Sequence, residues 1–168
     1  MLSGILATEE KDYNTGYSYF YEAIQLYLKL NDSSSALKTL LYMMLCKIMG
    51  NHYDEVIAIL HTAYGVKLKG NETEAMKKIA QANMDKSLID FNRCLVNYRS
   101  VIDGDLLIKR KMHGLYETLV EENIMKIVGS FSRVEITHVA ELLGLSEQEI
   151  LAKLSEMILD KKLNATLD

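Results

Sequence analysis

The chain has 168 residues, no proline and a formal net charge of −4. This length is sufficient for one large or two small domains with a real hydrophobic core. An average chain contains about 5% proline, and proline breaks helix interiors, so its absence favours an almost entirely helical fold. The longest apolar run, residues 40–46, is far shorter than the roughly 20 residues that cross a bilayer, and we expect no membrane association.

Cellular location is indicated by the cysteines and by the N-terminus. Cys46 and Cys94 are far apart and form no closely spaced pair. Residues 1–6 lack the basic region and the long apolar core of a secretory signal. Both features favour a reducing compartment, and we expect the protein in the cytoplasm and nucleus.

Charge is divided unevenly along the chain. Residues 1–114 carry 14 Lys and Arg against 13 Asp and Glu, which is a net charge of +1. Residues 115–168 carry 5 basic and 10 acidic residues, which is a net charge of −5. The C-terminal third is therefore the acidic part of the protein.

The first part of the chain predicts helices joined by short turns. Residues 13–30 place their apolar side chains along one stripe of a helix, as a helix packed on one side does. Asp32 and the serines after it predict an N-cap for a second helix over residues 36–48. We expect this helix to end at Gly50 and Asn51, because glycine tolerates a left-handed cap.

Shorter helices are expected next. One covers residues 54–61, and residues 71–74 resemble a capping box at the start of another, since Asn and Glu stand three positions apart. Ser87 predicts a further N-cap, and residues 103–104 predict a turn. A long helix over residues 106–130 then belongs to both halves of the chain.

These connections of two to six residues are those of stacked antiparallel helices. Within residues 12–23, Gly16 with Tyr17 and Phe20 resembles the small and aromatic contact positions of tetratricopeptide-like helices. There is one such unit rather than a strict repeat. We predict an all-α dominated fold that begins with a right-handed, TPR-like helical-repeat solenoid over residues 1–110.

Tyrosines are concentrated on the helix of residues 13–30. Core packing with solvated hydroxyl groups is the favoured interpretation. A partner-binding face is the alternative, because tyrosine is enriched at interfaces. Tyr19, which lies off the main apolar stripe, is the strongest candidate for that role.

The last part of the chain predicts the element order of a winged helix, namely helix, strand, helix, helix, strand. The short strand is predicted over residues 133–136, and the final strand begins at Leu163 and alternates apolar and polar residues, as a first wing strand does. No second wing strand follows. We therefore expect a truncated winged-helix part over residues 111–168, in a chain that is a fragment of a longer protein.

Local signals set the ends of the two helices between those strands. Thr137 is the expected N-cap of the first helix, and Gly144 ends it. Ser146 with Glu149 forms a full capping box for the second.

No catalytic or cofactor-binding pattern is present in the sequence. The four histidines are scattered, with no ligand spacing for zinc. Residues 65–70 superficially resemble a phosphate-binding loop, but Asn71 and Glu72 stand where Lys and Ser or Thr are required. We expect no enzymatic activity, no cofactor, no metal and no small-molecule substrate.

A winged helix binds either DNA or another protein. In the DNA-binding type, the N-terminal turn of the second helix of the pair meets the bases and phosphates, and here that turn carries Glu147 and Glu149. Phosphate contacts require Lys or Arg, so these carboxylates disfavour nucleic acid. The basic residues 109–111 are few enough to be simply solvated. Protein binding is favoured, and a nucleic-acid-binding winged-helix or PCI module is the alternative.

Four blocks of sequence, residues 17–23, 45–49, 131–138 and 154–162, closely resemble the PCI-domain subunits of the 26S proteasome regulatory particle lid, in the non-ATPase regulatory subunit 11 family. The resemblance covers essentially the whole chain. Subunit two of the COP9 signalosome has the same plan and is an alternative assignment. Residues 46–49 and 131–134 resemble the proteasome family more closely.

This resemblance implies a non-catalytic scaffold that supports lid assembly and ubiquitin-dependent protein degradation. Its expected partners are other PCI subunits of the lid and, in the intact protein, the ATPase ring and the core particle. In the family, neighbouring winged helices join edge to edge, and exposed strand edges are ready templates for another chain. The residues that would carry this contact here are Arg133, Val134, Glu135, Ile136, Leu163, Asn164, Ala165, Thr166 and Leu167.

Overall fold

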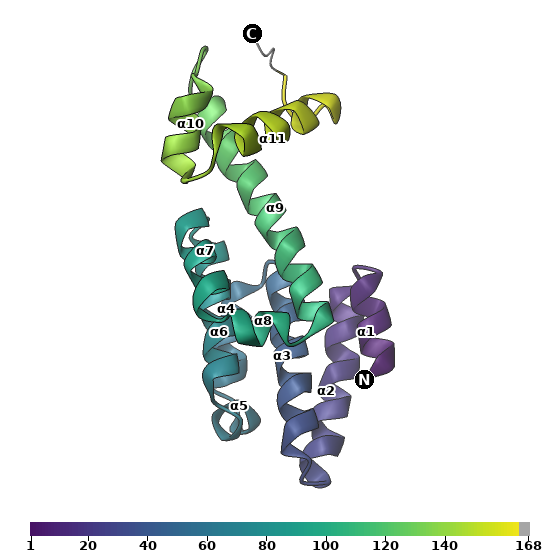
Figure 1. Cartoon of the computed structure of the whole chain (residues 1–168). Helices are drawn as coiled ribbons and strands as arrows, with labels where there is room; N and C mark the ends of the chain where they lie inside the picture. The colour runs from purple at the N-terminus through teal and green to yellow at the C-terminus, as the bar shows by residue number, and fades with distance from the viewer. Residues whose placement is uncertain (165–168) are drawn as a thin grey trace.

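The computed structural model describes residues 1–164, and every regular element in this range is an α-helix (Figure 1). The predicted helical character is therefore confirmed. The helices of this range are α1 (Leu2–Glu9), α2 (Tyr13–Lys29), α3 (Ser33–Met49), α4 (Tyr53–Leu60), α5 (Ala63–Lys67), α6 (Asn71–Met84), α7 (Leu88–Asn97), α8 (Arg99–Asp103), α9 (Leu106–Val128), α10 (Ile136–Leu143) and α11 (Glu147–Leu159).

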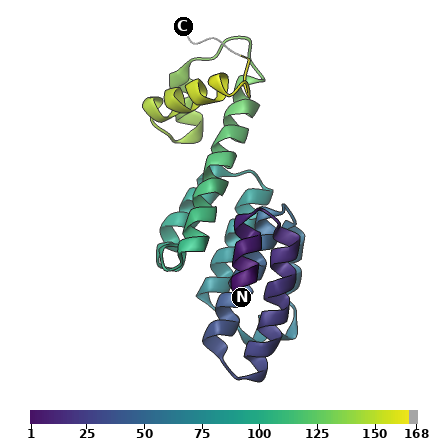
Figure 2. The ribbon, with the colours of Figure 1, turned by 90° about the vertical axis from the view of Figure 1, so that its right-hand side faces the viewer.

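The helices form a lower stack and a smaller upper unit that are joined by α9. Each of α1 to α4 packs on the helix before or after it, α6 packs on both α3 and α4, and α7 follows on α6. The N-terminal half of α9 contacts α3, α7 and α8, and its C-terminal half contacts α10 and α11. Both views show α9 leaving the stack and carrying α10 and α11 at its far end (Figures 1 and 2).

Side-chain caps begin several of these helices, and the caps expected at Asp32 and Ser87 are among them. Asp12, Asp32 and Ser87 accept hydrogen bonds from the backbone N–H three residues later. Asp105 accepts from the backbone of both Leu107 and Ile108. Each cap satisfies a donor that has no partner within the first turn of its helix.

The residue expected in the left-handed cap of α3 and the residue pair expected in the capping box of α6 are wrong. Gly50 is not left-handed, because the positive φ of 62° belongs to Asn51. Asparagine tolerates this conformation better than most residues other than glycine. At α6 the cap is a reciprocal bond between the Gly70 backbone and the Thr73 hydroxyl, and not the expected pairing of Asn71 with Glu74.

Close helix contacts depend on small residues. A side chain added at Gly16 on α2 would approach Thr8 on α1 to 2.7 Å, and one at Gly4 would approach the Phe20 ring to 2.6 Å. Gly65 on α5 lies against the backbone of Leu60, to which an added Cβ would come within 2.8 Å. Gly65 thus serves close packing, in agreement with the rejection of a phosphate loop at this position.

The strand expected over residues 133–136 is wrong. Glu135 has one extended conformation, with φ −81° and ψ 135°, but it is the N-cap of α10, and Ile136 is already the first helical residue. Thr137 is therefore not the N-cap. Val134 and Ile136 pack against the hydrophobic core from the entry loop and from the first turn, and this burial explains their alternating pattern without a strand.

The other expected strand is described only at its start. Leu163 and Asn164 have no regular structure, and Ala165, Thr166 and Leu167 lie outside the described residues. A winged-helix wing is accordingly not seen within residues 1–164. The domain boundary expected at residue 110 falls inside α9, in keeping with a helix that both halves share.

Candidate protein interface

The candidate interface lies on the unit formed by α10, α11 and the C-terminal half of α9. Its core consists of buried apolar side chains contributed by all three helices. These are Leu119, Ile124, Val139, Ala140, Leu143, Ile150, Leu154 and Met157. The three helices therefore form one packed body that can present a fixed surface.

Lys153 holds α11 against α9. Its ammonium nitrogen lies 2.7 Å from Glu117, 3.1 Å from Glu121 and 3.1 Å from Glu156, and the side chain is only 11% exposed. Burial disfavours the charged ammonium, but hydrogen bonds to the three carboxylates outweigh this effect and raise the pKa of Lys153. Lys162 adds a second bond to Glu121, of 2.9 Å.

The N-terminal turn of α11 is acidic and well organised. The Ser146 hydroxyl accepts from the Glu149 backbone N–H, and the Ser146 N–H donates to the Glu149 carboxylate, so the predicted capping box is confirmed. The Thr137 hydroxyl donates to Glu147 over 2.8 Å, which ties α10 to α11. The hydrogen bonds from Ser146 lower the pKa of Glu149.

Both carboxylates are exposed at the surface. Within residues 1–164, no ion pair links Glu147 or Glu149 to a cation. A turn of this kind repels phosphate groups. It therefore disfavours the major-groove contact that a DNA-binding winged helix makes.

The basic residues 109–111 are already paired with acids. Lys109 lies 3.1 Å from Asp103, and Arg110 lies 3.1 Å from Glu9. Lys111 lies 3.5 Å from the same Glu9 and donates to the backbone carbonyl of Thr8. These contacts bind α9 to α8 and α1, so the three cations serve the internal packing of the stack.

The predicted edge residues are divided between packing and exposure. Val134, Ile136 and Leu163 are partly buried against the core, whereas Arg133, Glu135 and Asn164 are exposed. Exposed residues on both sides of Val134 could contact a partner while Val134 holds the loop in place. The role of these residues in an interface stays a prediction.

Some tyrosines of α2 pack against the core, and others lie at the surface. Tyr13, Tyr17 and Tyr27 pack against the core, whereas Tyr19 is 44% exposed and Tyr21 is 46% exposed. Burial raises the pKa of Tyr17 to about 12. Core packing thus accounts for three members of this group, and Tyr19 is on the surface as expected.

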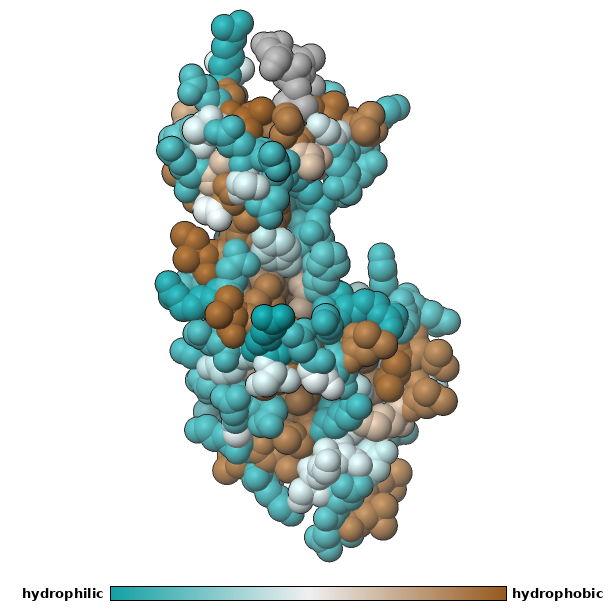
Figure 3. Space-filling view, viewed as in Figure 1, coloured by the Kyte–Doolittle hydropathy of each residue, from teal (hydrophilic) through white to brown (hydrophobic). Residues whose placement is uncertain are grey.

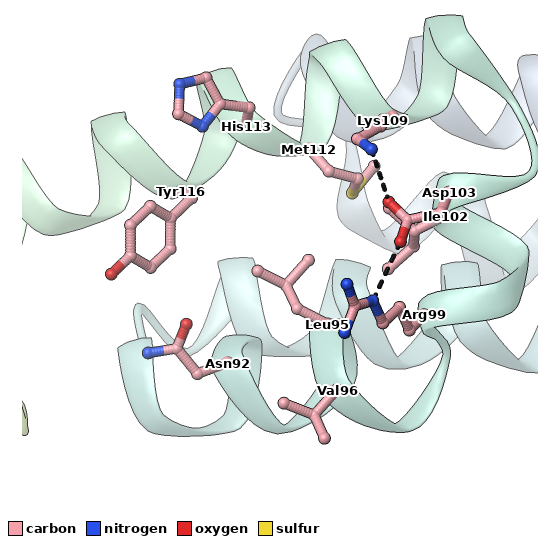
Figure 4. A pocket seen from close by; sticks show the side chains of 10 residues that line it. All are labelled: Asn92, Leu95, Val96, Arg99, Ile102, Asp103, Lys109, Met112, His113 and Tyr116. Atoms are coloured by element: carbon pink, nitrogen blue, oxygen red, sulfur yellow. Dashed lines mark hydrogen bonds and ion pairs between the residues drawn. The ribbon is translucent and has the colours of Figure 1, made fainter.

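Sequence reasoning missed a groove between α7, α8 and α9. It has a volume of about 510 Å³ and is lined by side chains from all three helices (Figure 4). No local signal identifies it, because its two walls come from separate segments. The Lys153 cluster was missed for the same reason, since Glu117 and Lys153 are far apart in the sequence.

Neither a metal site nor a membrane-spanning helix is found among the described residues. Among residues 1–164, no group of three or more His, Cys, Asp or Glu side chains is placed to hold a metal ion. None of the helices in this range has both the length and the apolar character to cross a bilayer.

Comparison with known proteins identifies the class. Residues 95–168 match the family model of the PCI domain, which includes α9, α10 and α11. This part of the chain is thus a PCI domain.

Its curated relatives are regulatory subunits of the 26S proteasome. The chain is 45% identical over 166 residues to the 26S proteasome non-ATPase regulatory subunit 11 homolog of Arabidopsis thaliana, covering 99% of this chain and 39% of that protein. It is 43% identical over 166 residues to the probable 26S proteasome regulatory subunit rpn6 of Schizosaccharomyces pombe, covering 99% and 39%. It is 42% identical over 169 residues to the 26S proteasome non-ATPase regulatory subunit 11 of Dictyostelium discoideum, covering 100% and 41%.

The protein is homologous to these subunits over its whole length, and the resemblance seen in the sequence is confirmed. It spans about two fifths of the length of the relatives that it matches.

Proposed function

We propose that this protein is a non-catalytic scaffold subunit of the proteasome regulatory lid, which supports lid assembly and ubiquitin-dependent degradation through contacts between PCI domains. The homology to proteasome regulatory subunits over nearly all of this chain carries the proposal. The names of the relatives in Arabidopsis and Dictyostelium describe non-ATPase subunits. Activity in the cytoplasm and nucleus is part of the same proposal.

The finer architecture belongs to this proposal as well. Residues 1–110 act as a right-handed helical-repeat stack, and residues 111–168 act as a winged-helix part. The stack and α9 hold the upper unit at a fixed position, which is what a joint between neighbouring subunits requires. The partners are other PCI subunits of the lid and, for the intact protein, the ATPase ring and the core particle.

The electrostatic character of the upper unit favours a protein partner. Glu147 and Glu149 are exposed carboxylates at the turn that would approach DNA, and Arg110 and Lys111 are engaged with Glu9. Nucleic-acid affinity depends on unengaged Lys and Arg side chains. The proposal therefore includes no nucleic acid, no membrane and no small-molecule substrate.

The test uses the protein tagged in the cells from which it comes. Co-purified subunits are identified and quantified by mass spectrometry, and lid subunits are expected in fixed ratio to the tagged protein. Recovery of signalosome subunits in their place would assign the protein to that complex. Recovery of neither set would remove the scaffold proposal.

A paired charge reversal addresses the predicted edge without disturbing the core. Arg133→Glu combined with Glu135→Lys changes two exposed side chains and leaves Val134 and Ile136 in place. We expect lid subunits to be lost from the purified material. The matched control is Glu22→Lys with Lys29→Glu, two exposed positions on α2, which should leave assembly unchanged. Equal recovery with both double variants would exclude residues 133–136 from the interface.

A further inference from the structure

The groove between α7, α8 and α9 has an apolar floor. Ile102 and Met112 are buried beneath it, and Leu95 is half-buried at its wall. Its volume of about 510 Å³ falls within the range of roughly 300–1,000 Å³ that is typical of binding pockets. It is open along its length, so it suits an extended or helical segment that lies in it.

Apolar surface continues from the groove onto its rim. Val96, which lines the groove, is 75% exposed, and Ile89, two helical turns earlier on α7, is 59% exposed. Figure 3 shows apolar side chains gathered over α7 on this face. Exposed valine and isoleucine at this spacing form a row along one side of the helix, next to the floor described above.

One end of the groove is cationic. The Nε of Arg99 donates to Asp103 over 3.1 Å, and the ammonium of Lys109 lies 3.1 Å from the other oxygen of the same carboxylate (Figure 4). Two cations therefore share one anion. The Arg99 side chain is 82% exposed and the Lys109 side chain is 58% exposed, so both retain donors for a second carboxylate.

Asn92, His113 and Tyr116 line the opposite end of the groove (Figure 4). Burial, together with the charge of Glu149 on α11, raises the pKa of Tyr116. The two cations near Asp103 therefore distinguish one end of the groove from the other. A ligand with apolar side chains and one acidic end matches this pattern in a single orientation.

We propose that this groove binds a polypeptide segment of a partner protein, whose apolar side chains fill the floor and whose acidic residue meets Arg99 and Lys109. Binding in this groove is independent of the proposed function, because it involves neither residues 133–136 nor the lid. A carboxylate at this end completes a cluster of two cations and two anions. Charge-assisted hydrogen bonds to Arg99 then fix the orientation of the segment.

A nucleic acid fits this surface less well. A phosphate backbone would require a track of cations, whereas the groove has two that are partly neutralised by Asp103 and an apolar floor between its ends. A polypeptide with apolar side chains and one acidic residue satisfies both the cationic end and the floor.

The experiment selects a phage-displayed library of 12-residue peptides on the purified 168-residue chain. Enriched sequences are expected to share apolar residues followed by Asp or Glu. Fluorescein-labelled copies are then titrated by polarisation against five forms of the protein, namely the unaltered chain, two groove variants and two controls. Arg99→Glu with Lys109→Glu should weaken binding by about tenfold or more, because the acidic residue then meets like charge. Val96→Asp should also weaken it.

Two control variants carry similar changes away from the groove. Lys29→Glu with Lys126→Glu reverses two exposed cations, and Leu159→Asp places a carboxylate at a side chain that is 81% exposed. Both should bind the peptides as the unaltered protein does, and circular dichroism checks that every form is folded. A 20-nucleotide single-stranded RNA is titrated in parallel.

Three results would overturn the proposal. The first is an absence of enriched peptides, and the second is enrichment of peptides without acidic residues. The third is binding that Arg99→Glu with Lys109→Glu leaves unchanged. RNA binding that this double variant abolishes would assign the groove to nucleic acid instead.

Discussion

Lys153 on α11 donates a hydrogen bond of 2.7 Å to the Glu117 carboxylate on α9, two residues that are 36 positions apart. Only 11% of the Lys153 side chain is exposed, against 40% of the Glu117 side chain. The bond joins the last described helix to the long helix that emerges from the stack. The orientation of α11 on α9 therefore depends on one nearly buried cation together with apolar packing.

Replacing Lys153 by Met should destabilise the protein by about 1–2 kcal/mol, because its removal leaves three carboxylates facing each other, of which only Glu121 is largely shielded from solvent. Here the remaining carboxylates are Glu117, Glu121 and Glu156. Urea unfolding followed by circular dichroism measures the free energy of unfolding. Lys126→Met, at an exposed position of α9, is the control and should change it by less than about 0.5 kcal/mol. Equal effects would show that the cluster does not stabilise the fold.

Asp105 predicts a specific dependence of stability on pH. Burial opposes its ionisation, but hydrogen bonds from Tyr42 and the Ile108 backbone, with the nearby Lys38, lower its pKa overall. A carboxyl whose pKa is lower in the folded state stabilises above its unfolded value near 4, and the contribution is lost as pH falls through the folded-state value. Urea unfolding at about pH 7, 5, 4 and 3 should reveal this loss of stability.

Two variants attribute this effect to Asp105. Asp105→Asn keeps a capping oxygen for α9 but removes the charge, so its deficit relative to the unaltered protein should be larger at neutral pH than in acid. Lys38→Met removes the cation that lies 3.1 Å from Asp105 and should reduce the dependence in part. A deficit of Asp105→Asn that is constant with pH would contradict the assignment.

Two glycines give opposite predictions for the same substitution. Gly65→Ala should destabilise by about 2–3 kcal/mol, because its Cβ would meet the backbone of Leu60 at 2.8 Å. Gly114→Ala should stabilise by about 0.5–1 kcal/mol, because nothing lies within 4 Å of the added methyl group in the interior of α9. Thermal and urea unfolding of both variants measure the difference. A loss of stability in Gly114→Ala would contradict the presence of free space for a methyl group at this position.

The capping box of α11 is testable through Ser146. Ser146→Ala removes the acceptor of the Glu149 N–H and should cost about 1 kcal/mol. Ser18→Ala, whose hydroxyl bonds the Asn14 carbonyl within α2, removes no cap and should change the free energy of unfolding by less than about 0.5 kcal/mol. An equal loss of stability in both variants would show that the effect of Ser146→Ala does not come from the helix cap.

Local features account for the expectations that the structure confirms. Periodic apolar residues identify the long helices, and α9 ends within two residues of its predicted end. Asp32, Ser87 and Ser146 are found as caps because a cap involves residues only three positions apart. The four residues 133–136 are too few for alternation to identify a strand. A loop that buries Val134 and Ile136 produces the same pattern.

The sequence by itself determined the helical character, most helix boundaries, the acidity of the C-terminal part and the resemblance to proteasome subunits, because these depend on composition, short spacings and residue identity. Only the tertiary structure decided which charges meet. Glu9 neutralises Arg110 from 101 positions away, and Glu117 receives Lys153 from a separate helix. It also decided that α7, α8 and α9 enclose a groove. Such relationships require the packing of helices, whose geometry is set by the whole core rather than by any one segment.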